Sequence, residues 1–216
     1  MATPLEEFSE ALKLHASEFG IEFEPEHIDR LGDYFELLLK WNPTLHLVAP
    51  CSPEEFATRH VLESLMLLRH LSPNARVIDV GSGAGLPIIP CLIMRDDLRA
   101  TLIESSQRKA VFLREALRIV SSRERALLLV TRFEETIAPE AEFVMCRAMD
   151  RFQQFLPTLI DWAPPASTLL LFTGDALRKL VEALLPSVKA ERMPKSEQRF
   201  LMIAPRDVAS QKERPN

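Results

Sequence analysis

The chain has 216 residues, 47% of them hydrophobic, and a formal net charge of −5 at pH 7. This length is enough for one sizeable α/β domain with a small helical addition. The acidic charge argues against a protein that binds bare nucleic acid, since such proteins are usually basic. An RNA partner would therefore have to meet a local basic face or belong to a preassembled particle. Nothing resembles a signal peptide or a membrane span, so we expect a soluble, cytoplasmic protein.

The three cysteines give no sign of a metal centre or of a disulfide framework. Cys51, Cys91 and Cys146 lie far apart in the sequence and form neither a CxxC pair nor a Cys/His cluster. We expect them to be buried free thiols, and we expect no metal. The oligomeric state cannot be read from the sequence, and a monomer is the simplest expectation.

The first 72 residues have the pattern of helices. Capping boxes at Thr3-Pro4-Leu5-Glu6 and Ser52-Pro53-Glu54-Glu55 each predict a helix start, with proline at the first helical position. Apolar residues at spacings of three and four predict another helix from Pro25 to about Trp41, which Asn42-Pro43 should end. We therefore expect residues 1–72 to form a helical segment that packs on the core.

From residue 73 onward, short β-type runs alternate with amphipathic helical patterns. This alternation predicts a mostly parallel, seven-stranded sheet with helices on both faces, closed by a hairpin that turns at Pro194. The expected strands are 76–80, 99–104, 126–130, 142–146, 168–172, 188–193 and 199–203. We expect the α/β domain to cover residues 73–206, and the patternless residues 207–216 to form a flexible tail.

The first expected strand, Arg76–Val80, runs directly into Gly81-Ser82-Gly83-Ala84-Gly85, which holds three of the six glycines of the chain. Alternating glycines after a strand leave a bare backbone that can approach a ligand closely. In an α/β sheet this is the carboxyl end of a strand, where ligands bind. A structural turn without a ligand is the alternative.

The spacing of these glycines indicates which ligand the loop suits. A dinucleotide site has G-x-G-x-x-G opening directly into a helix, whereas here G-x-G-x-G is followed by Leu86-Pro87. Asp79, inside the strand, would repel phosphates but suits a ligand with ammonium and sulfonium charges. We therefore expect S-adenosylmethionine (SAM) as the cofactor, held by Asp79 and by the loop through Gly85. A nicotinamide-dependent oxidoreductase is the weaker alternative.

Two further positions extend the expected cofactor site. Glu104 ends the second strand, where a carboxylate can accept hydrogen bonds from both hydroxyls of an adenosine ribose. Phe133 follows the third strand and should lie beside the adenine with its ring against the base. A solvated strand end and a surface helix start are the respective alternatives.

Charged residues are expected on the other side of the same crevice. Arg147 ends the fourth strand and can hold the SAM carboxylate or a substrate phosphate, with a salt bridge to Asp150 as the alternative. His60 lies one helical turn from Glu63 and Ser64 and can share a face with them. A packing role for His60 is the alternative.

The stretches considered so far belong to a larger set that occurs in order along the chain. The set is Lys40-Trp41-Asn42 with Leu47, Arg59-His60-x-x-Glu63-Ser64, Asp79 to Pro87, Leu102-Ile103-Glu104-Ser105, Arg108-Lys109, Phe112-Leu113 and Arg147-Ala148. It resembles the RsmG (GidB) family of bacterial small-subunit ribosomal RNA methyltransferases, which act on N7 of a guanine. The resemblance covers about residues 30–205.

The resemblance implies a Rossmann-like SAM-dependent methyltransferase fold and methyl transfer to N7 of a guanine in 16S ribosomal RNA. The implied partner is that RNA or the small ribosomal subunit. The residues that would line the SAM site are Gly81, Gly83, Leu86, Glu104, Phe133, Glu134 and Arg147. Asn42, Arg59 and His60 would face the substrate, and Arg147 and His60 are the catalytic candidates.

The chain also departs from the family pattern on the substrate side. It has His46-Leu47-Val48 where the family usually has Asn-Leu-Thr, Ile88 in place of a second glycine, and Thr173-Gly174 in place of Lys-Gly. Glu63 and Glu104 replace aspartates. The lost polar groups keep an alternative open, namely a SAM-binding protein with lost or altered RNA methylation that acts by binding or regulation.

Overall fold

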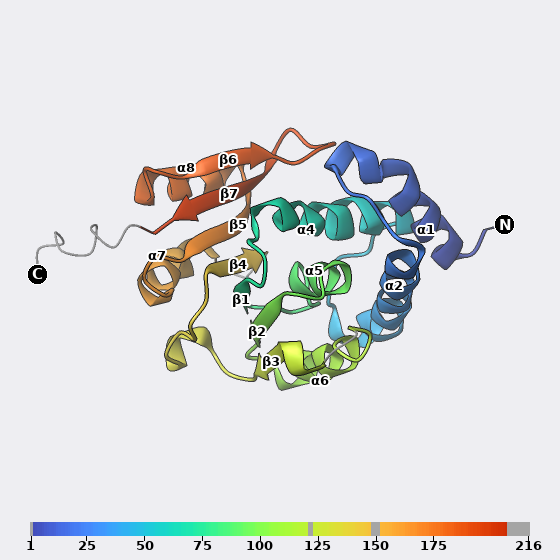
Figure 1. Cartoon of the computed structure of the whole chain (residues 1–216), viewed down its shortest axis with the longest axis horizontal. Helices are drawn as coiled ribbons and strands as arrows, with labels where there is room; N and C mark the ends of the chain where they lie inside the picture. Colours follow the sequence, from blue (N-terminus) through green and yellow to red (C-terminus); the bar gives the residue numbers. More distant parts are fainter. Residues whose placement is uncertain (1, 121–122, 148–151, 207–216) are drawn as a thin grey trace, which may run out of the picture.

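The computed structural model of the chain describes residues 2–120, 123–147 and 152–206, and their strands form a seven-stranded sheet covered by helices (Figure 1). The strands lie in the order β3-β2-β1-β4-β5-β7-β6. They are β1 (Arg76–Val80), β2 (Arg99–Ile103), β3 (Ala126–Leu129), β4 (Phe143–Arg147), β5 (Thr168–Gly174), β6 (Lys189–Arg192) and β7 (Arg199–Pro205). The expected α/β class is confirmed, while the expected tail at 207–216 lies outside the described residues.

Strands β1 to β5 run parallel to one another. The expected closing hairpin is formed by β6 and β7, and β7 is antiparallel to β5. Parallel strands are buried on both faces because the connecting helices cover both sides. Successive residues of β1 show this, since Val77 belongs to the hydrophobic cluster on one face and Ile78 to the cluster on the other.

The N-terminal helices, α5 and α6 pack on one face of the sheet, and α7 and α8 pack on the other (Figure 1). The regular helices are α1 (Pro4–His15), α2 (Pro25–Leu45), α3 (Pro53–Glu55), α4 (Glu63–Leu65), α5 (Ile88–Met94), α6 (Gln107–Ala116), α7 (Phe152–Trp162) and α8 (Asp175–Leu184). Shorter or irregular turns are η1 (Ala16–Phe19), η2 (Phe56–Leu62), η3 (Met66–His70), η4 (Arg123–Arg125) and η5 (Phe133–Glu135). In the described part of the chain, no helix has the length and apolar character needed to cross a bilayer.

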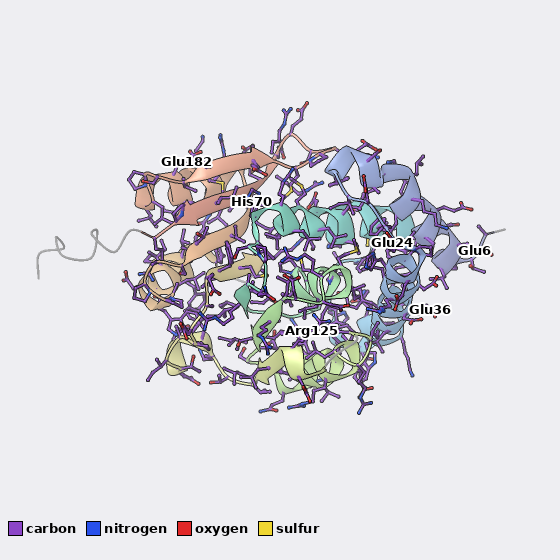
Figure 2. The ribbon with its side chains drawn as sticks, viewed as in Figure 1. Glu6, Glu24, Glu36, His70, Arg125 and Glu182 are labelled. Atoms are coloured by element: carbon purple, nitrogen blue, oxygen red, sulfur yellow. The ribbon has the colours of Figure 1, made fainter. Side chains whose placement is uncertain are left out.

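The helices of residues 1–72 begin where the capping signals predict. Glu6, on the outer side of α1 in Figure 2, forms the reciprocal capping box with Thr3, and Ser52 Oγ accepts from the backbone N–H of Glu55 (3.0 Å). Inside, Phe8 stacks on Phe35 with ring centroids 4.4 Å apart. These rings belong to the same hydrophobic cluster as Val77 of β1 and residues of α5 and α6, so the N-terminal helices share their core with the sheet.

Helix α2 continues past the position where Asn42-Pro43 was expected to end it, and reaches Leu45. Pro43 lies in the last turn, where a missing N–H removes only one hydrogen bond from the helix. The helix ends instead at His46, which adopts the left-handed conformation (φ 49°) and donates its backbone N–H to Asn42 O (2.9 Å). His46 is therefore a C-cap, a position at which asparagine is also favoured.

Helix α5 follows the glycine loop directly and has no counterpart among the expected elements. Its residues Ile88 to Ile93 are all buried, so the segment lacks the one-sided apolar pattern that identifies a surface helix. Arg125, labelled in Figure 2, supports its carboxyl end by donating to Arg95 O (3.0 Å) and to Asp96 Oδ1 (2.9 Å). The loop is thus backed by a helix buried on all sides.

The helix that the capping box at Ser52 predicts is also irregular. It begins and continues with single α-helical turns, α3 and α4, but residues Phe56–Leu62 between them form a π-helix. π-Turns inside helices occur frequently at functional sites because they widen the helix and change which carbonyl groups are free. This π-helix carries Arg59 and His60, two of the expected substrate-side residues.

One hydrogen bond joins the N-terminal helices to the glycine loop. The hydroxyl of Tyr34, on α2, is fully buried and donates to Ala84 O (2.6 Å). We expect Tyr34→Phe to lower the free energy of unfolding by about 1–2 kcal/mol, because the Ala84 carbonyl would lose its partner in a buried position. Urea denaturation measures this difference, and an unchanged stability would show that the bond does not anchor the loop.

Candidate cofactor and substrate site

A cavity of about 540 Å³ lies at the carboxyl ends of β1, β2, β3 and β4, beside the π-helix. Its volume is in the range of sites that bind small organic molecules. The residues lining it are Leu47, Val48, Ala49, Arg59, His60, Val80, Gly81, Ser82, Gly83, Ala84, Leu86, Ile103, Glu104, Ser105, Lys109, Thr131, Arg132, Phe133, Glu134, Arg147 and Phe155. Most of the expected site residues are therefore brought together, although Asn42, Asp79 and Gly85 do not line the cavity.

The glycine loop leaves its backbone open to this cavity. Gly81 and Gly83 adopt positive φ angles (73° and 52°), and the backbone N–H groups of Gly81 and Ser82 both donate to Ile103 O. A Cβ placed on Gly83 would meet no atom closer than Gly81 O at 3.6 Å, so the space beside Gly83 is open. The loop can therefore admit a ligand against its backbone.

Gly85 has a different role from the one expected. Its φ is 79°, and a Cβ placed on it would lie only 2.4 Å from Cγ1 of the buried Ile89. The glycine is thus required for close packing of the loop on α5, and the expectation that Gly85 contacts the cofactor is not supported by its position. The alternating glycines thus differ in their surroundings, because Gly81 and Gly83 line the cavity whereas Gly85 packs against α5.

We expect Gly85→Ala to lower the free energy of unfolding by about 3 kcal/mol, since the new methyl group combines a steric overlap in the core with a left-handed backbone. Chemical denaturation measures this loss. The matched control is Gly20→Ala, because Gly20 also has a positive φ (69°) but no atom within 4 Å of the added Cβ. Equal losses in the two variants would mean that packing on Ile89 is unimportant.

Glu104 lies at the end of β2 with only 7% of its surface exposed, and its carboxylate faces the loop. Oε2 accepts from the backbone N–H of Gly83 (2.8 Å), and Oε1 accepts from the backbone N–H of Ser106 (2.7 Å). Each carboxylate oxygen can accept a second hydrogen bond. Glu104 can therefore hold the loop in place and still accept from the two hydroxyls of a ribose.

Asp79 is fully buried on β1, behind the loop. Neither of its carboxylate oxygens has a hydrogen-bond partner among the described residues, and the Ser82 hydroxyl donates to its backbone oxygen instead (3.0 Å). Burial, with a smaller contribution from the charge of Glu104, raises the pKa of Asp79 to about 8. Asp79 does not line the cavity, so its influence on a cationic ligand there would act through the loop.

The wall beyond Glu104 is built by the short η5 turn. Phe133 and Glu134 both line the cavity, and the Phe133 ring is anchored edge-on against Trp162 (centroids 5.4 Å apart) and Phe155 (6.4 Å). Phe155, on α7, also lines the cavity and lies under the guanidinium of Arg132 (5.8 Å). No sequence pattern points to Phe155, because an aromatic residue inside an apolar helix is usually part of the core.

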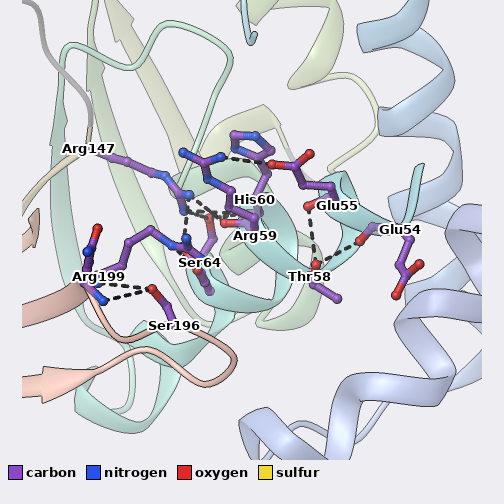
Figure 3. Close-up of polar contacts among 11 residues, drawn as sticks. Glu54, Glu55, Thr58, Arg59, His60, Ser64, Arg147, Ser196 and Arg199 are labelled. Atoms are coloured by element: carbon purple, nitrogen blue, oxygen red, sulfur yellow. Dashed lines mark hydrogen bonds and ion pairs between the residues drawn. The ribbon is translucent and has the colours of Figure 1, made fainter. Parts of the chain in front are cut away.

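Arg147, at the end of β4, is hydrogen-bonded to residues of the π-helix η2 and of the adjoining turn α4 (Figure 3). It donates to the backbone oxygens of Arg59 (2.6 Å) and His60 (3.5 Å), to Ser64 Oγ (3.2 Å) and to the carboxylate of Glu63 (3.3 Å). Burial lowers the pKa of Arg147, and the charge of Glu63 opposes that effect. Asp150, the partner considered from the sequence, lies outside the described residues.

His60 lines the cavity with its ring packed on Phe56 (centroids 5.3 Å apart). Its Nδ1 is buried and has no hydrogen-bond partner in the described part of the chain. Burial, followed by the charges of Arg147, Arg59 and Arg199, lowers the pKa of His60 to about 3. The imidazole is therefore neutral near pH 7, while the half-exposed Arg59 beside it pairs with Glu55 (2.9 Å).

Asn42, one of the expected substrate-side residues, does not line the cavity. Its side-chain amide exchanges two hydrogen bonds with the backbone of Val48, at 3.0 and 3.1 Å. This arrangement holds the segment Leu47–Ala49 against the cavity.

Lys109, in the first turn of α6, also lines the cavity and adds a positive charge to it. Among the described residues, no group of three or more His, Cys, Asp or Glu side chains could hold a metal ion.

Ribosomal RNA small subunit methyltransferase G of Sorangium cellulosum (strain So ce56) is 35% identical over 188 residues, covering 84% of this chain and 77% of the relative. The protein of the same name from Chromobacterium violaceum is 30% identical over 196 residues, covering 84% and 93%. An RNA methyltransferase from Salinibacter ruber, solved in complex with S-adenosyl-L-homocysteine (SAH), shares the fold with a TM-score of 0.54 at 17% identity, covering 78% and 97%.

The fold is thus that of SAM-dependent methyltransferases, as the resemblance predicted. Residues 27–204 match the family described as rRNA small subunit methyltransferase G, also called GidB. This match spans most of the chain and includes the glycine loop, Glu104 and Arg147. The chain therefore belongs to the rRNA small subunit methyltransferase G family.

Proposed function

We propose that this chain transfers a methyl group from SAM to N7 of a guanine in small-subunit ribosomal RNA. The observation that carries the proposal is the open glycine backbone facing the buried carboxylate of Glu104 in one cavity, in a chain of this family. The relatives are named as ribosomal RNA methyltransferases, and the Salinibacter ruber protein binds SAH, the demethylated form of SAM. SAM supplies an electrophilic methyl group on its sulfonium sulfur.

The strand order suggests how the cofactor would lie. The cavity follows the strand ends in the order β3, β2, β1, β4. With the ribose at Glu104, the adenine would lie beside Phe133 and Glu134 next to β3. The amino-acid part would then extend past Gly81 toward Arg147 at the end of β4. The carboxylate of SAM would thus approach the guanidinium, which is a favourable charge-assisted contact.

The chemistry needs no general base, because guanine N7 carries an in-plane lone pair and no proton. The site has to hold N7, the methyl carbon and sulfur in line, and orientation of this kind can lower a barrier by about 7–11 kcal/mol. The methylated ring becomes cationic, so a neutral His60 on the cavity wall avoids adding a further positive charge beside it.

We expect the single-turnover rate of methyl transfer to show no inflection from His60 between about pH 6 and pH 9. The reason is that burial and the neighbouring guanidinium groups lower the pKa of His60 to about 3, so the imidazole does not titrate in this window. Single-turnover rates of the wild type and of His60→Gln test this. An inflection near neutral pH that disappears in the variant would contradict the neutral assignment.

The proposed partner is the small ribosomal subunit rather than bare RNA. The net charge of −5 opposes long-range attraction to RNA, while the mouth of the cavity carries the local cations Arg59, Lys109 and Arg132. A preassembled particle can present a single guanine to the few basic side chains at the cavity. The proposed setting for this reaction is the cytoplasm.

Transfer of a labelled methyl group tests the proposed function. SAM with a labelled methyl group is incubated with the wild type and with either intact small subunits or protein-free RNA, both prepared without the modification. We expect label on guanine N7, with more on intact subunits. A wild type that binds SAM but labels neither substrate would favour the alternative, a cofactor-binding protein without RNA methylation.

A further inference from the structure

A buried carboxylate is shared between two arginines beside the cavity. Glu63 is 2% exposed, and its two oxygens have different partners from distant parts of the chain. Oε2 lies 3.3 Å from Arg147 at the end of β4, and Oε1 lies 2.8 Å from Nε of Arg199 at the start of β7. Glu63 therefore links Arg147, which lines the cavity, to Arg199 in the C-terminal hairpin of β6 and β7.

The protein already uses most of the donors of Arg147. Its two terminal nitrogens donate to the backbone oxygens of Arg59 and His60, to Ser64 and to Glu63. A guanidinium has five N–H groups. Among the described residues, the hydrogen bonds of Arg147 come from its two terminal nitrogens. Figure 3 shows Arg147 and Arg199 reaching toward the same part of the helix, beside Ser64. The position of Arg147 is thus set by protein groups rather than by a ligand.

The charges of Arg147, Glu63 and Arg199 do not cancel, because two guanidinium groups share one carboxylate. Glu63 is the carboxylate whose charge raises the pKa of Arg147, while Arg59 and Arg199 lower it. A simple pair of Arg147 and Glu63 would be neutral and would offer little attraction to an anion. Because Arg199 shares the same carboxylate at the shorter distance, one positive charge is in excess beside the cavity. That surplus lies where the carboxylate of the cofactor is proposed to reach.

We propose that Arg199 is a positioning residue for the cofactor carboxylate, acting through Glu63 on Arg147. By occupying one oxygen of Glu63, Arg199 keeps Arg147 from being neutralised and leaves its positive charge available to the cavity. Arg199 does not line the cavity, so its effect is indirect. The inference rests on the proposed SAM site and assigns the C-terminal hairpin a part in cofactor recognition.

The test compares two ligands that differ only in the carboxylate, namely SAH and its decarboxylated form, which keeps the amine. Calorimetry on Arg199→Met should show SAH affinity reduced by about tenfold or more, the loss typical of a weakened charged contact. Binding of decarboxylated SAH should be unchanged. Arg199→Lys should recover most of the SAH affinity because it restores the charge. Arg192→Met, which removes an exposed arginine from the same hairpin, should bind both ligands like the wild type.

A general structural effect of the substitution would weaken both ligands equally, and that result would overturn the proposal. Unchanged SAH affinity in Arg199→Met would overturn it as well. Arg199→Gln provides a second uncharged variant if the methionine variant does not fold. A wild type that binds neither ligand would refute the proposed cofactor site itself, so the two failures can be told apart.

Discussion

Replacing Gly83 by aspartate should abolish SAM binding and methyl transfer while the fold survives. Gly83 lines the cavity in a left-handed conformation, and its N–H donates to Glu104. An aspartate side chain would fill the space beside the loop and place a second carboxylate against Glu104. We expect SAH affinity to fall by at least about a hundredfold. The cost in stability should be only about 1 kcal/mol, because aspartate tolerates the left-handed region better than most residues.

Calorimetry with SAH and thermal denaturation measure the two quantities separately. Gly20→Asp is the matched control, since Gly20 has a similar positive φ with open space around it and lies at the end of η1, outside the cavity lining. It should bind SAH like the wild type. Gly83→Asn adds similar bulk without charge and should retain part of the affinity. Full methylation by Gly83→Asp would refute the assignment of the loop.

The second large effect concerns Asp79 and the dependence of stability on pH. Burial raises the pKa of this carboxyl from an ordinary value near 3.8 to about 8, so the folded state holds a proton that the unfolded state releases. The contribution of Asp79 to stability is therefore fully present below about pH 4 and is lost as the pH rises toward 8. Each pH unit in that window should cost the wild type about 1.4 kcal/mol.

Urea denaturation of the wild type and of Asp79→Asn at several pH values isolates this effect, since asparagine keeps the shape and cannot ionise. From about pH 5 to about pH 8, the wild type should lose about 4 kcal/mol relative to the variant. A constant difference between the two proteins would show that Asp79 has an ordinary pKa in the folded state. Binding of cationic SAM should also release a proton near pH 8, because a positive charge in the cavity favours the ionised carboxyl.

The loss of stability caused by the buried Asp79 can be related to its position behind the glycine loop. A carboxyl with no hydrogen-bond partner among the described residues is expensive in a buried position. It lies directly behind a loop that leaves room for a cationic ligand. An uncompensated group that destabilises the free protein can be compensated when the ligand arrives. A cation bound at the loop would favour the ionised form of Asp79 beneath it, while the carboxylate of Glu104 offers hydrogen-bond acceptors at the rim of the loop.

The parts of the fold that the sequence could predict are those with strong local signals. Thr3 and Ser52 begin helices because their side chains satisfy backbone N–H groups, and β1 is recognisable because an apolar run stops at glycines. Helix α5 was missed because it is apolar on every side and therefore has no period. The π-helix at Phe56–Leu62 was missed because its amphipathic spacing resembles that of an α-helix over a short stretch.

The site was predictable to the extent that its residues end strands. Glu104 and Arg147 were found because the carboxyl ends of parallel strands converge at one edge of the sheet. The role of Gly85 depends on the distance to Ile89, which sequence spacing does not reveal. The link from Glu63 to Arg199 joins residues far apart in the chain and needs the antiparallel β7 beside β5. Contacts of that kind follow from topology and cannot be read from a motif.

The most direct measurement of the central claim is a crystal structure of the wild type grown with SAH. We expect the ribose hydroxyls to donate to the carboxylate of Glu104, with the amino-acid part crossing Gly81 and its carboxylate at Arg147. A structure with the ligand elsewhere, or with Glu104 turned away from the sugar, would contradict this account of the cavity.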